Sequence, residues 1–122
     1  MDTIMLQKIS KNIILVIAII ISLWIVYNTL ASKKINDADA LVDQALDYNL
    51  DGQYKKAVDI LTPLAEKGIS RAQLYMAVAY YHGNGVNKNY AKAKEIFFHL
   101  QDKQYETKIV ATYLNLLGMM EQ

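Results

Sequence analysis

An uncharged apolar run near the amino terminus sets the first limit on what this chain can fold into. Residues 13–30 read IILVIAIIISLWIVYNTL, with Ser22, Asn28 and Thr29 as the only polar interruptions. At a rise of about 1.5 Å per residue, a helix of this length covers roughly 27 Å, close to the hydrocarbon thickness of a bilayer. A soluble helix normally keeps one polar stripe, and this run has none. We therefore predict a transmembrane anchor at residues 13–30, preceded by a short tail at residues 1–12.

Two alternatives to an anchor are a buried core helix and a cleaved signal peptide. The tripeptide at residues 29–31, TLA, loosely resembles a small-x-small cleavage site. The run is long for the apolar region of a signal peptide, and Trp24 and Tyr27 near its end are typical of side chains at a membrane interface. We expect the anchor to be retained.

The lysines around the run leave its orientation weakly defined. Lys8 and Lys11 precede it, while Lys33 and Lys34 follow it, so the positive-inside rule gives a tie. The free amino terminus and the acidic residues in segment 37–39 favour an amino terminus inside the cell. We predict a single-pass protein of the cytoplasmic (inner) membrane, with the part after the anchor on the periplasmic, outer side.

Charge and cysteine content exclude several classes of function. The net charge is +1, and the 13 basic residues are scattered among 12 acidic ones, so no nucleic-acid-binding surface is indicated. The chain has no cysteine, which rules out a disulfide framework and a lipid-attachment cysteine.

Beyond a linker predicted at residues 31–35, residues 36–122 show apolar positions at spacings of three and four, which is the helical period. Asn36 or Asp37 is the expected N-cap of the first helix, and Ser70 is the expected N-cap of the third. Pro63 is expected to kink the second helix or make its last turn irregular. The predicted helices span about residues 36–50, 53–67, 70–82, 89–101 and 105–120.

The helical part contains an internal repeat. A shift of 36 residues places YKKAVDILTPLAEKG, from Tyr54, on YAKAKEIFFHLQDKQ, from Tyr90, whereas the preceding helices align at a shift of 32. The difference is a four-residue insertion containing GNG. A helix, not a strand, enters this glycine-rich stretch, and it lacks a phosphate-loop fingerprint. We expect Gly83 to cap a helix, Gly85 to reverse the chain and Val86 to pack between the helices.

Two sets of residues mark the two repeats: in the second repeat Ala72, Gln73, Ala77, Tyr80, Gly83, Gly85, Val86, Lys92 and Ala93, and in the first repeat Leu41, Ala45, Tyr48, Tyr54, Ala57, Leu61 and Leu64. With these residues the second repeat resembles the Sel1-like repeat, and the first is similar to a tetratricopeptide repeat. The resemblance implies an all-α fold: one transmembrane helix, then a short Sel1-like and tetratricopeptide-like α-solenoid of about two helix pairs with a C-terminal capping helix. Ala77 and Asn89 depart from the usual Sel1-like glycine and aspartate.

Little in the sequence favours catalysis. His82 and His99 are the only histidines, and no carboxylate lies at a metal-ligand spacing, such as four residues, from both of them. The chain does not resemble the cysteine-rich Sel1-like proteins that have been linked to enzymatic activity. We predict no catalytic residue, no metal site and no cofactor, and expect a protein that is not an enzyme.

Apolar side chains on the predicted first and third helices suggest a binding surface. In repeats of this kind the first helix of each pair lines the concave face, which can accept a helix or an extended peptide. The alternative is that the fifth helix simply buries this surface. The predicted groove consists of Val42, Leu46, Asn49, Leu50, Arg71, Leu74, Val78, Tyr81 and His82.

These features predict a membrane-anchored protein–protein interaction module, acting as a scaffold or assembly adaptor of a bacterial envelope complex. One alternative is an immunity-type inhibitor that captures a toxin at the membrane, and another is an enzyme. Two repeats with a cap are fewer than the three or so that a solenoid usually needs. We expect the membrane, a partner protein of unknown identity or self-association to supply the missing burial.

Overall fold

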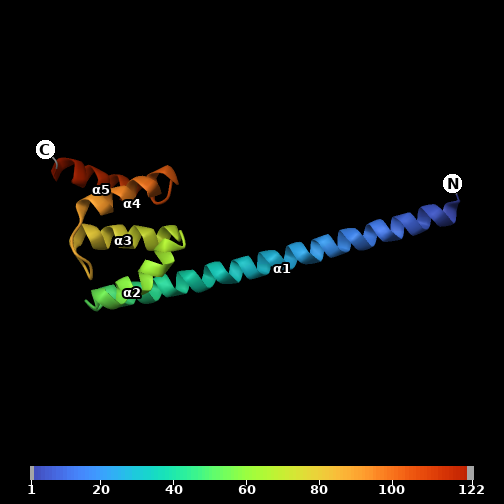
Figure 1. The fold of residues 1–122 in the computed structure, drawn as a ribbon, viewed down its shortest axis with the longest axis horizontal. Helices are drawn as coiled ribbons and strands as arrows, with labels where there is room; N and C mark the ends of the chain where they lie inside the picture. Colours follow the sequence, from blue (N-terminus) through green and yellow to red (C-terminus); the bar gives the residue numbers. More distant parts are fainter. Residues whose placement is uncertain (1, 121–122) are drawn as a thin grey trace. The chain divides into compact units, whose positions relative to one another are not determined.

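The computed structural model describes residues 2–120, which are all-α with no strand. Contacts divide the chain into two units, Met1–Asp37 and Ala38–Gln122, so the first helix contributes to both. The helices, labelled in Figure 1, are α1 (Thr3–Leu50), α2 (Tyr54–Glu66), α3 (Ser70–His82), α4 (Tyr90–Asp102) and α5 (Thr107–Met120).

Helix α1 corrects the predicted boundary after the anchor. Residues 31–35, expected to form a linker, are helical, and most of the predicted tail is helical from Thr3 onward. Asn36 and Asp37 lie inside α1, so the prediction that one of them caps a new helix is wrong. No glycine or proline occurs before Gly52, so the sequence contains nothing strong enough to end the helix earlier.

Among the described helices, α1 alone is long and apolar enough to cross a membrane, and none of its most apolar window is buried. Its few polar side chains within that stretch bond to carbonyls of the same helix, four residues back. Such bonds satisfy these groups without water, as a hydrocarbon environment requires. The pairs are Ser22 Oγ to Ala18 O at 2.8 Å, Asn28 Nδ2 to Trp24 O at 2.9 Å and Thr29 Oγ1 to Ile25 O at 2.8 Å.

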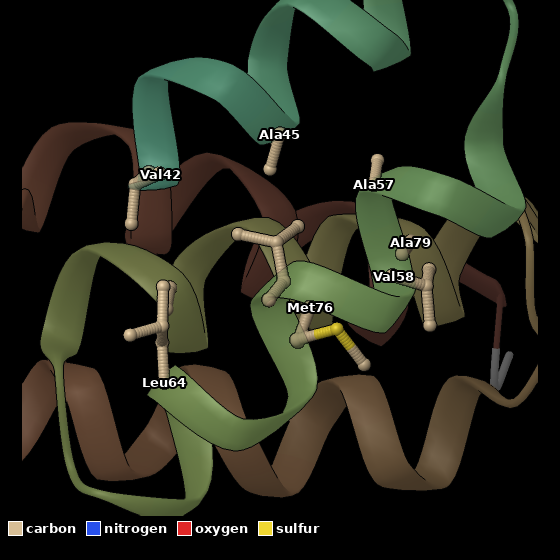
Figure 2. Packing of buried hydrophobic residues seen from close by; sticks show 9 residues of the cluster. Val42, Ala45, Ala57, Val58, Leu64, Met76 and Ala79 are labelled. Carbon is tan, nitrogen blue, oxygen red and sulfur yellow. The ribbon is translucent and has the colours of Figure 1, made fainter. Parts of the chain in front are cut away.

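Two apolar clusters hold the second unit together. The first combines the end of α1 with α2 and α3, and Figure 2 shows Val42 and Ala45 of α1 beside the α2 and α3 side chains of this cluster. The second combines α3, α4 and α5 around Phe97, whose ring is fully buried and stacks on Tyr113 at 4.9 Å between centroids. Each of the helices α2, α3 and α4 packs against the next one along the chain (Figure 1). Because α3 belongs to both clusters, it links the two halves of this unit.

Apart from the start of α1, the predicted helix ends agree with the structure to within two residues. Asn89 caps α4, since its side-chain oxygen accepts a hydrogen bond from the Lys92 backbone N–H at 2.9 Å. Ser70 is the first residue of α3 rather than its cap, and Ile69 holds the cap position with no side-chain bond. Helix α5 begins later than predicted because Gln104 and Glu106 have positive φ values of 54° and 44°, which break the helical path.

Candidate functional site

A groove opens in the second unit between the last turns of α1 and one side of α3. Its volume is about 450 Å³, and its lining is mostly apolar. Leu50 lies at its edge with 86% of its surface exposed. The lining residues are Leu46, Asn49, Leu50, Tyr54, Tyr75, Val78, Ala79, His82 and Asn84.

Five of the nine residues expected at the groove line it. Helix α1 contributes Leu46, Asn49 and Leu50, which share one face because they are three and four residues apart. Helix α3 contributes Val78 and His82, which are four residues apart.

The other four expected residues lie elsewhere. Val42 is completely buried in the first cluster and Leu74 is 5% exposed in the second, so both belong to the core. Arg71 binds Asp43 at 2.6 Å and Asp39 at 3.8 Å, joining α3 to α1 beside the groove. The hydrogen bond to Asp43 raises the pKa of the Arg71 guanidinium above its ordinary value.

Tyr81 points into an aromatic cluster between α3, α4 and α5. Its ring lies 5.1 Å from that of Tyr113 and 5.5 Å from that of Tyr90, with edge-on or tilted geometry. Burial raises the pKa of the Tyr113 hydroxyl, which lies 3.5 Å from His82 Nε2. The alternative prediction, that the fifth helix buries the apolar surface of α3, is therefore correct for Leu74 and Tyr81. The groove on the other side of α3 stays open.

Sequence reasoning missed Tyr54, Tyr75, Ala79 and Asn84 as groove residues. For two of them a signal existed, since Tyr75, Ala79 and His82 recur at spacings of four and three and define one face of α3. Tyr54 and Asn84 come from helix ends and loops, where no periodicity operates.

The glycine-rich loop builds one wall of the groove. Gly83 ends α3 in the left-handed conformation with φ of 75°, and its N–H donates to Ala79 O at 2.8 Å, as predicted for a helix cap. Gly85, also at φ of 75°, lies so close to α2 that a Cβ there would overlap the Tyr54 carbonyl group. This approach places Asn84 beside Tyr54 at the groove. Val86 packs on the first cluster, which confirms its predicted position.

The histidines are not gathered into a metal site. His82 lines the groove, and His99 is exposed near the end of α4. In residues 2–120, no group of three or more His, Cys, Asp or Glu side chains is arranged to hold a metal ion.

Comparison of the chain with protein families, with curated proteins and with solved structures gives no match. We therefore infer the function from the geometry of the groove.

Proposed function

We propose that the protein is a membrane-anchored protein–protein interaction module that holds a partner at the cytoplasmic membrane. The observation that carries this proposal is the open apolar groove between α1 and α3. Leu50, exposed, and the rings of Tyr54 and Tyr75 offer contact area there. Aromatic side chains lose little rotamer entropy on binding and often dominate the binding energy of interfaces.

The packing of the second unit supports a repeat architecture like that of Sel1-like and tetratricopeptide proteins. Each apolar cluster is made by three successive helices, and α3 is common to both. Stacked helix hairpins produce this pattern, because each hairpin buries its remaining apolar face on the first helix of the next. In this proposal α5 is the terminal cap, and the groove lies on the face lined by the first helices of the two hairpins.

The membrane helix gives the module its cellular role in this proposal. An anchor at residues 13–30 would confine the groove near one membrane surface, where a partner is met at a high effective concentration. A scaffold or assembly adaptor of a bacterial envelope complex, with the helical part on the outer side, fits this arrangement.

The test is site-specific photo-cross-linking of the full chain in its native membrane. A photoreactive residue at Asn49, which lines the groove, is expected to give a discrete adduct with one protein. The same residue placed at Glu95, exposed on α4 and remote from the groove, serves as the matched control.

The second half of the test adds Leu50→Gln to the Asn49 probe. Because Leu50 is 86% exposed, this change should leave the fold intact while removing apolar contact at the groove. The adduct should then lose most of its yield. An adduct of equal yield from the Glu95 probe, or one insensitive to Leu50→Gln, would refute the proposed function.

A further inference from the structure

A row of aspartates runs along the side of α1 next to the groove. Asp39, Asp43 and Asp47 recur at intervals of four, and Asp51 continues the series in the turn that follows. Residues three and four apart on a helix are surface neighbours, so Asp47 borders Leu50, a lining residue of the groove. The groove therefore has an apolar floor and an acidic rim on its α1 side.

The negative charge of this rim is compensated at one end only. Arg71 pairs with Asp43 and Asp39, as described above, but the other two aspartates make no ion pair in the described part of the chain. Both Asp47 and Asp51 are exposed. A cation would find uncompensated carboxylates there, immediately beside the apolar floor.

Helix stability does not account for the aspartates at this position. The carboxyl-terminal end of a helix carries partial negative charge, so Asp47 in the last turn of α1 and Asp51 just beyond it are unfavourable there. The last turn of α1 has no basic residue that would offset them. A positively charged partner would relieve this repulsion on binding.

We propose that the groove takes a basic amphipathic helix of a partner protein, with its apolar face on the floor and its lysines or arginines against Asp47 and Asp51. This inference rests on the proposed function. A helix suits the site because it satisfies its own backbone hydrogen bonds, whereas the mostly apolar lining offers an extended segment few partners. Anionic lipid headgroups are disfavoured as occupants, because the acidic rim repels them.

The experiment uses the full chain in nanodiscs of phosphatidylcholine, a lipid with no net charge, and two fluorescent synthetic peptides. Both peptides form amphipathic helices with the same leucine face, but one carries lysines on its polar face and the other carries glutamates. Fluorescence anisotropy measures binding, and the signal from empty nanodiscs is subtracted. The basic peptide is expected to bind at least about tenfold more tightly than the acidic one at low salt, and added salt should weaken its binding.

Charge-neutralising variants locate the effect. Asp47→Asn combined with Asp51→Asn should weaken binding of the basic peptide about threefold to tenfold, the effect expected of two exposed charge pairs. Asp43 stays unchanged, so the bond to Arg71 is kept. The matched control, Glu95→Gln combined with Asp102→Asn, removes the same charge from α4, which contributes no groove residue, and should leave binding unchanged.

The outcomes separate this inference from the proposed function. Equal binding of both peptides that is lost on Leu50→Gln would overturn the basic partner but leave the groove as a docking site. Binding of both peptides that ignores Leu50→Gln would overturn both proposals. The chain has no cysteine, so Leu50→Cys introduces a single thiol. Disulfide-linked dimers of that variant, formed without peptide, would assign the groove to a second copy and overturn the inference.

Discussion

Replacing Gly85 with alanine should destabilise the second unit strongly, for two separable reasons. A left-handed backbone conformation costs an L-residue about 1 to 2 kcal/mol relative to glycine. The new Cβ would also overlap the carbonyl of Tyr54 and lie 3.0 Å from the Lys55 nitrogen. Backbone atoms cannot rotate away, so the loop or the start of α2 must shift, at a further cost of about 1 to 3 kcal/mol. The expected total is about 2 to 5 kcal/mol.

Two other glycines provide matched controls. Gly52 and Gly68 have positive φ values of 74° and 83°, but no atom lies within 4 Å of a Cβ built on either one. Alanine at either position adds only the cost of the left-handed backbone conformation. The loss of conformational entropy in the unfolded chain is the same for alanine at Gly52, Gly68 and Gly85. The difference between Gly85→Ala and Gly68→Ala therefore isolates the close approach of the loop to α2.

The measurement is urea unfolding of the full chain in a neutral detergent, followed by circular dichroism. Gly85→Ala should lower the free energy of unfolding by at least about 1 kcal/mol more than Gly68→Ala does. It should also weaken binding of the basic peptide, because Tyr54 and Asn84 form part of the groove wall. Equal destabilisation by the two substitutions would show that the loop does not press on α2 and would refute the reasoning.

Three further predictions concern the core, a helix cap and alkaline stability. Phe97→Ala should lower the free energy of unfolding by about 3 to 5 kcal/mol, because the Phe97 ring is fully buried. Phe98 is 48% exposed, so Phe98→Ala should lower it by under about 1 kcal/mol. Similar urea midpoints for the two variants would contradict the assigned buried face of α4. Asn89→Ala should cost about 1 kcal/mol through loss of the α4 cap, and Ser70→Ala close to nothing, as measured by thermal unfolding. Burial raises the pKa of the Tyr113 hydroxyl in the folded protein. The stability gained from the neutral hydroxyl is therefore complete below the ordinary tyrosine pKa of about 10 and is lost as the pH rises through the higher pKa of the folded state. Tyr113→Phe should reduce this loss of stability at alkaline pH, as measured by unfolding at a series of pH values.

Local patterns were sufficient for most of the helical organisation. Apolar spacing of three and four predicted every helix of the second unit, and the glycines marked the ends of three of them. The conformation of Gly83 followed from the same local logic, since the residue after a helix commonly needs a positive φ. The prediction of a helix cap at Asn36 or Asp37 was wrong because residues that favour caps can also lie within a helix when no stronger signal ends it. A cap is a preference of a few tenths to about 2 kcal/mol, and that is too little to break an otherwise continuous helix.

The groove could be predicted more fully on α1, where three of four expected residues line it, than on α3, where two of five do. Helix α1 alternates apolar and acidic positions near its end, so its faces are distinguishable from the sequence. Helix α3 is apolar around most of its circumference, in the stretch LYMAVAYY, so periodicity cannot say which side faces solvent. Tertiary packing determines which side of α3 is buried and which side faces solvent. Helix α5 covers the side of α3 that carries Tyr81, and the Gly85 loop places Tyr54 and Asn84 on the side that stays open. Local sequence patterns could not predict these two contacts, because both join residues far apart in the sequence and depend on how the helices stack.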